Sequence, residues 1–251
     1  MIKKLIDILK PNTVNKIPKG FGVPELPNSI YQGKHLFKSS DFKNIVNDIF
    51  LPRIQELGFK GKDFIYFREN SIYNETVFFW TFKYGGAIAV DLLIKFKNIH
   101  YPDDKKILKA RDVRPNNAEF QKRLSPNGEL NKQGQNVWFW IFEDSLEGNK
   151  KIAEDIWRIF SIRGIEYFDN FKNHKAYIEQ ITPKNYKTLP DFDIPKLFGR
   201  HDKGIIYFLF EYWRQMEDQT KAMEFAKLGL AEINDETYLT LFKNYLETAT
   251  R

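Results

Sequence analysis

The stretch TVFFWTFKYGGAIAVDLLIKFK (residues 76–97) decides the fold. It consists of two runs rich in β-branched and aromatic residues, joined by Gly85 and Gly86. Because the favoured tight turns of β-hairpins need positive φ at both central positions, two adjacent glycines predict a hairpin with a two-residue turn. In that register Trp80 and Asp91 would be cross-strand neighbours.

Side chains alternate across a strand, so this hairpin has two different faces. The mostly aliphatic face is expected to be buried beneath the helices predicted at residues 41–57 and 145–163, and it carries Val77, Phe79, Val90, Leu92 and Ile94. The other face is mostly aromatic and includes one carboxylate, Asp91. We therefore expect a sheet with both faces at least partly covered.

The remaining elements predict an α+β fold with an antiparallel sheet of about four to five strands packed on two main helices. Further strands are expected at residues 63–68, 120–124 and 137–142, and Ser145 is expected to cap the second helix. Three domains follow from the pattern. Residues 1–38 predict an amphipathic helix and an extended arm, residues 39–181 the α+β core, and residues 182–251 a connector and C-terminal helices at about 203–218, 220–233 and 235–249.

Several motifs occur in this order: ELGFK at the end of the first helix (residues 56–60), WFW in a late strand (138–140) and RGIEYFDNF after the second helix (163–171). As a set they resemble the bacterial domain-of-unknown-function family 4304 over about residues 40–181. The resemblance implies an α+β domain of a bacterial protein. It gives no established activity, so no catalytic residue is carried over from it.

Composition excludes several kinds of site. The chain of 251 residues has no cysteine, so disulfides, thiolate metal sites and cysteine nucleophiles are ruled out. The longest apolar run near the C-terminus, at residues 205–210, is far shorter than the roughly 20 residues of a membrane helix. With no apolar run long enough for a signal peptide near Met1, a cytoplasmic protein without membrane insertion is the expectation.

The net charge of +6 is concentrated at the start of the chain. Residues 1–38 hold seven lysines against Asp7 and Glu25, which leaves a balance of only +1 for the remaining residues. This argues against nucleic acid as the main partner, because nucleic-acid binding needs a basic stripe on a folded surface. The most basic segment of the body is interpreted as a solvated face, and it contains Lys105, Lys106, Lys109, Arg111, Arg114, Lys122 and Arg123.

Enzyme motifs are absent from the sequence: there is no P-loop, G-x-S-x-G, H-E-x-x-H or glycine-rich dinucleotide fingerprint. The four histidines (His35, His100, His174 and His201) lie far apart on different predicted elements. Asp191 and Asp193 are interpreted as an ordinary polar turn between prolines. We expect no catalytic residue, no metal site and no cofactor.

The aromatic sheet face is the candidate site. Rings from four strands gather on one face if the opposite set points toward the helices: Ile65, Phe67, Val137, Phe139 and Ile141. The candidate ligand-binding residues there are Tyr66, Arg68, Trp80, Asp91, Trp138 and Trp140, with Arg68 as the expected partner of Asp91. Rings supply contact area and ionic groups supply orientation, as in a ligand or peptide groove. The alternative is that the arm and the C-terminal helices cover this face as a second core.

The function expected from these observations is a non-enzymatic binding module for a protein or peptide, such as a toxin-neutralising immunity protein. Two alternatives stay open. One is a nucleic-acid-associated protein that uses the basic arm, and the other is an enzyme of unrecognised type.

Overall fold

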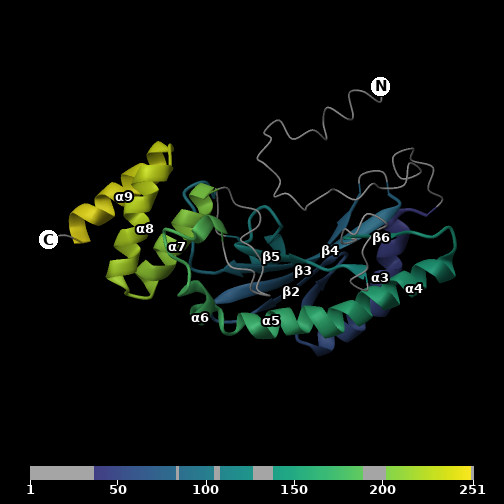
Figure 1. Cartoon of the computed structure of the whole chain (residues 1–251). Coiled ribbons are helices and arrows are strands. Elements are labelled where there is room, and N and C mark those ends of the chain that lie inside the picture. Colours follow the sequence, from purple (N-terminus) through teal and green to yellow (C-terminus); the bar gives the residue numbers. More distant parts are fainter. Residues whose placement is uncertain (1–36, 83–84, 105–107, 127–137, 189–201, 250–251) are drawn as a thin grey trace, which may run out of the picture.

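The deciding stretch forms two long antiparallel strands, β3 (Tyr73–Thr81) and β4 (Ala87–Phe96), in the computed structural model, which describes residues 37–82, 85–104, 108–126, 138–188 and 202–249. The predicted N-terminal arm and most of the predicted connector lie outside the described residues. The α+β fold with an antiparallel sheet and C-terminal helices is confirmed (Figure 1).

The predicted register of this hairpin is wrong by two residues. Trp80 lies opposite Ala89, and Asp91 lies opposite Phe78. The reason is the length of the connection, because β3 ends at residue 81 and β4 begins at residue 87. The adjacent glycines do adopt positive φ (76° and 79°), but they belong to a connection between residues 81 and 87 that is longer than a two-residue turn.

The faces of the hairpin are nevertheless as predicted, since a shift of two residues keeps every side chain on its own side. The aliphatic set is buried, with at most 2% of any side chain exposed: Val77, Phe79, Val90, Leu92 and Ile94. We call this side of the sheet the helix face. The other side, which the loop at residues 108–118 covers in part, we call the open face.

The sheet order is β1-β2-β3-β4-β5, with β6 also paired to β4 and every pair antiparallel. The shorter strands are β1 (Lys60–Lys62), β2 (Ile65–Glu69), β5 (Phe120–Arg123) and β6 (Trp140–Ile141). β4 lies in the middle, and all ten of its residues are buried. This central position is why even its two charged residues, Asp91 and Lys95, are buried.

A turn that the sequence analysis missed sets the direction of the β2 side chains. Asp63 and Phe64 both have positive φ (55° and 75°) and join β1 to β2 as a two-residue hairpin turn. β2 therefore begins at Ile65, and Tyr66 lies opposite Val77 on the helix face. The prediction that residues 65 and 67 point toward the helices is wrong.

Two helices cover the helix face, as predicted: α3 (Ser39–Glu56) and α4 (Leu146–Ile159). Phe50 of α3 connects the layers, because its ring lies 5.1 Å from Phe79 of the sheet and 5.2 Å from Trp157 of α4. Ser145 caps α4 by accepting the Gly148 N–H at 3.0 Å, which confirms the predicted cap.

α4 continues through a π-helical turn, η3 (Phe160–Gly164), into α5 (Ile165–Phe171), and the three run as one long segment along the sheet (Figure 1). Gly164 permits this turn, since a Cβ there would lie 2.4 Å from the Phe160 ring. The short helices are η1 (Ala110–Asp112), α6 (His174–Ile178) and η4 (Tyr186–Thr188).

The C-terminal helices α7 (Asp202–Gln215), α8 (Gln219–Glu232) and α9 (Glu236–Ala249) form a group at one end of the sheet, opposite to β6 (Figure 1). α7 joins this group to the core, because Phe208 contacts Phe96 and Phe120 while Phe210 contacts Phe242 of α9. In the described part of the chain, no helix is both long and apolar enough to cross a membrane.

Candidate functional site

The open face carries a buried ion pair between two strands. Arg123 of β5 lies directly opposite Asp91 of β4 and donates from Nε and Nη2 to its two carboxylate oxygens, at 2.7 and 2.9 Å. Asp91 is fully buried, whereas 29% of the Arg123 side chain is exposed. Arg68 was the predicted partner of Asp91, and that prediction is wrong.

Trp80 lies beside this pair on the same face. Its ring centroid is 5.6 Å from the Arg123 guanidinium carbon, and 51% of the residue is exposed. The small cross-strand neighbour Ala89 leaves room for this arrangement. An exposed tryptophan on a central strand, held against a fixed arginine, is a rigid contact surface.

A second arginine–aromatic pair adjoins the first one. Arg114 places its guanidinium carbon 5.4 Å from the ring of Phe78, which lies two residues before Trp80 on β3. The loop at residues 108–118 brings Arg114 there, since Val113 and Ala118 pack against Leu93 and Phe78 on the open face.

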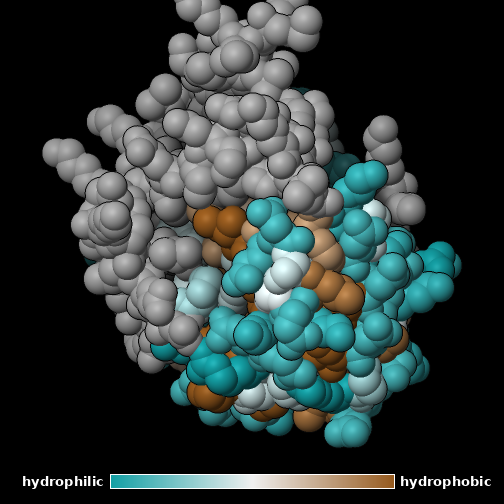
Figure 2. Space-filling model, turned by 90° about the vertical axis from the view of Figure 1, so that its right-hand side faces the viewer, coloured by the Kyte–Doolittle hydropathy of each residue, from teal (hydrophilic) through white to brown (hydrophobic). Residues whose placement is uncertain are grey.

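The part of the open face next to β6 is apolar. Phe82 and Trp138 pack over a small cluster of Ala87, Ala89 and Phe139. Ile141 lies opposite Ala87 in β6 and keeps 40% of its surface exposed. Figure 2 shows the end of the molecule that carries β6, where apolar patches lie between hydrophilic side chains.

Three of the six predicted candidates are on the helix face instead. Tyr66 is fully buried, and burial raises the pKa of its hydroxyl well above its usual value. Arg68 binds Glu75, and burial still raises the pKa of that carboxyl. Trp140 donates its indole N–H to Asp155 of α4 at 2.8 Å. The structure therefore places Trp80, Asp91 and Trp138 on the open face and the other three on the helix face.

The histidines and the Asp191–Asp193 turn were the other site features considered in the sequence. His100 is exposed and His174 is buried, while His35, His201, Asp191 and Asp193 lie outside the described residues. Among the residues that the structure describes, no group of three or more His, Asp or Glu side chains is arranged to hold a metal ion.

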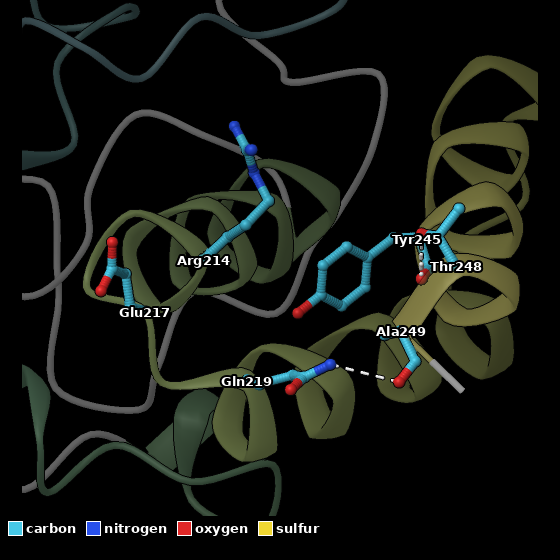
Figure 3. Close-up of a pocket in the computed structure, with 6 residues that line it drawn as sticks. All are labelled: Arg214, Glu217, Gln219, Tyr245, Thr248 and Ala249. Atoms are coloured by element: carbon cyan, nitrogen blue, oxygen red, sulfur yellow. Dashed lines mark hydrogen bonds between the residues drawn. The ribbon is translucent and has the colours of Figure 1, made fainter. Parts of the chain in front are cut away.

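Two hollows occur among the C-terminal helices. One of about 320 Å³ is lined by Arg214, Glu217, Gln219, Tyr245, Thr248 and Ala249 (Figure 3). Figure 3 shows Tyr245 pointing from α9 toward α7, and Gln219 donating to the Ala249 carbonyl. Arg214 already binds Glu211 on its own helix, so the hollow offers the Glu217 carboxylate beside neutral groups.

The other hollow, of about 620 Å³, lies between the loop after β4 and helices α7 and α9. Tyr207 crosses its floor to donate to the His100 carbonyl at 3.1 Å. Lys203 binds Asp103 and Asp235 nearby, at 2.8 and 2.9 Å. These bonds fasten the C-terminal helices to the core, which is a structural role.

No family model, curated protein or solved structure matches the chain. The resemblance to domain-of-unknown-function family 4304 accordingly stays a prediction.

Sequence reasoning missed the role of Arg114 and Arg123, which it interpreted as part of a solvated face. One signal could have found Arg123: a buried carboxylate on the central strand requires a cation, and Arg123 lies in the strand predicted at residues 120–124. Arg114 had no such signal, because a loop places it.

Proposed function

We propose that this protein is a non-enzymatic binding module of the cytoplasm that recognises a protein partner with the open face of its sheet. The contact surface is the Trp80 surface, which we define as Phe78, Trp80, Arg114, Arg123 and Ile141.

The observation that carries the proposal is the exposure of Trp80 on a rigid strand. A half-exposed tryptophan offers a large area that becomes favourable once a partner covers it. Tryptophan and arginine are enriched among the residues that dominate protein–protein binding energies. Here the two lie 5.6 Å apart, and Asp91 already holds the arginine in one orientation, so binding needs little further ordering of these side chains.

The ionic pairs of the sheet support binding over catalysis. Each buried acidic or lysine side chain described on the sheet or in its covering loop is paired with an opposite charge: Glu75 with Arg68, Asp91 with Arg123, and Lys95 with Glu119. Lys95 and Glu119 also bind the Ile99 carbonyl and the Phe96 N–H. Such satisfied pairs hold strands and loops in place. A toxin-neutralising role would be one form of this function.

Affinity capture with full-length baits tests the proposal. Wild type, Trp80→Ala and Ile162→Ala are compared in lysates of the source cells, partners are identified by mass spectrometry, and the affinity of the purified partner is measured by calorimetry. Ile162 is the control, because it is 58% exposed but lies on η3, whose Phe160 packs against Phe50 on the helix face of the sheet.

We expect Trp80→Ala to lower the affinity for the partner roughly tenfold or more, as for a binding hot spot, and Ile162→Ala to leave that affinity unchanged. A partner that binds both variants equally well would remove the Trp80 surface as the binding site.

A further inference from the structure

We infer that the partner presents an extended acidic segment, which places a carboxylate on Arg114 and an apolar side chain on Trp80. This inference rests on the proposed function and specifies the chemistry of the partner.

Arg114 is a fixed guanidinium that binds backbone carbonyls and an aromatic ring within the described part of the chain. Its Nη1 donates to the carbonyls of Arg111 and Val113, both at 2.8 Å, and its backbone N–H donates to Asn117 at 2.7 Å. The Phe78 ring supports the same group at 5.4 Å. No carboxylate among the described residues pairs with it.

Comparison with Arg123 shows which guanidinium donors of Arg114 are left for a ligand. Arg123 uses its Nε and Nη2 edge to bind both oxygens of Asp91. In Arg114 only Nη1 is occupied by the described residues, so the corresponding Nε and Nη2 edge is unused. A planar two-donor edge matches a carboxylate, and bidentate arginine–carboxylate bonds are among the strong charge-assisted ones.

The spacing of the two arginine–aromatic pairs indicates an extended ligand. Phe78 and Trp80 are two residues apart on one face of β3, which corresponds to about 7 Å along a strand. A bound extended chain repeats its side chains with the same period. An acidic residue two positions from an apolar residue would therefore reach Arg114 and Trp80 together.

The charge around the surface favours an acidic partner. The loop that covers this face carries Lys109, Arg111 and Arg114 against Asp112, while Asp91 neutralises Arg123. This local excess is too small for a run of phosphates, since tight nucleic-acid binding neutralises many of them. A protein segment with one or two carboxylates fits it better.

Selection of short random peptides displayed on phage tests the inference. The baits are full-length wild type, Trp80→Ala, Arg114→Met, Arg114→Lys and Ile162→Ala, each checked for folding by circular dichroism. We expect wild type and Ile162→Ala to enrich peptides with Asp or Glu two positions from an aromatic or aliphatic residue. Arg114→Met should lose the acidic preference and keep the apolar one.

The best peptide is then synthesised with its acid and with the corresponding amide. At about 150 mM salt, where screening leaves mainly short-range pairs, the acid form should bind wild type roughly tenfold tighter than it binds Arg114→Met. Arg114→Lys should fall between them, because it keeps the charge without the planar edge. The amide form should not distinguish the three proteins.

The outcomes separate this inference from the proposed function. If Trp80→Ala weakens binding but Arg114→Met does not, or if no acidic preference emerges, the inference is wrong and the binding surface stands. If Trp80→Ala binds the selected peptides as well as wild type, the proposed function fails with it. Arg114-dependent binding of a labelled single-stranded oligonucleotide at the same salt, tighter than any peptide, would overturn the inference in favour of nucleic acid.

Discussion

Asp91 and Arg123 face each other across β4 and β5, and the arginine donates to both carboxylate oxygens. The two residues depend on this contact unequally. Asp91 is fully buried, whereas 29% of the Arg123 side chain is exposed and can reach water. The carboxylate therefore needs the guanidinium more than the guanidinium needs the carboxylate.

Removal of either partner should show this asymmetry in the free energy of unfolding. Arg123→Leu leaves a buried carboxylate unpaired, and we expect it to cost about 3–5 kcal/mol. Asp91→Leu leaves an arginine that water can solvate, so its cost should be closer to about 1–3 kcal/mol. Urea unfolding of both variants at pH 7 measures the difference.

The double variant Asp91→Leu/Arg123→Leu is the control for this pair. It removes both charges, so it should be clearly more stable than Arg123→Leu alone. Equal stability of the double variant and Arg123→Leu would show that the pair is not the source of the loss.

How far the sequence predicts this fold is clearest at the central hairpin. Alternation in β3 and β4 was sufficient to assign both faces, because a face depends only on the parity of a position. The register was not predictable, since the sequence does not reveal that the connection holding Gly85 and Gly86 runs from residue 81 to residue 87. The glycine pair marks where the chain turns without showing how many residues the turn takes.

The candidate site was half predictable for a related reason. Phe64 at a φ of 75° is a conformation that bulky residues rarely adopt, so no sequence rule places a turn there. That turn moves Tyr66 and Arg68 to the helix face. Trp80 and Asp91 were assigned to the correct face, although not to the correct cross-strand partners, because they belong to the long, strongly alternating hairpin.

A surface position offers a gain in stability. Glu217 follows the end of α7 at Gln215 and has a φ of 59°. The N–H of the next residue, Asp218, donates to the Trp213 carbonyl at 3.1 Å. This is a helix end that glycine adopts more readily than other residues. Glu217→Gly should raise the free energy of unfolding by about 0.5–1 kcal/mol. A loss of stability in urea unfolding would show that the Glu217 side chain itself contributes.

His174 should make stability depend on pH. It is buried among the rings of Tyr73, Phe96, Phe171 and Tyr212, and burial lowers its pKa, partly offset by the hydrogen bond at the Phe171 carbonyl. The unfolded chain then binds this proton more readily, so stability should fall as the pH drops below the unfolded value of about 6.5 and level off below the folded pKa.

Replacement His174→Asn isolates this effect. Asparagine can still donate to the Phe171 carbonyl but does not titrate. Between pH 7.5 and 5.5 wild type should lose up to about 1.4 kcal/mol per pH unit more than this variant. Burial raises the pKa of Glu75, so its contribution to stability rises as the pH falls. Because both proteins contain Glu75, this contribution cancels in the comparison. If the free energies of unfolding of the two proteins changed in parallel with pH, His174 would bind its proton equally well in the folded and unfolded chains.

The two tryptophans Trp80 and Trp140 should separate stability from binding. Trp140 is 5% exposed and donates to Asp155, so Trp140→Ala should cost about 3–5 kcal/mol in urea unfolding. Trp80 is half exposed, so Trp80→Ala should cost roughly 1 kcal/mol or less. Partner binding should show the reverse order: folded Trp140→Ala keeps its partner, whereas Trp80→Ala loses it. If Trp80→Ala were as unstable as Trp140→Ala, Trp80 would belong to the core, and the open face would not be the binding surface.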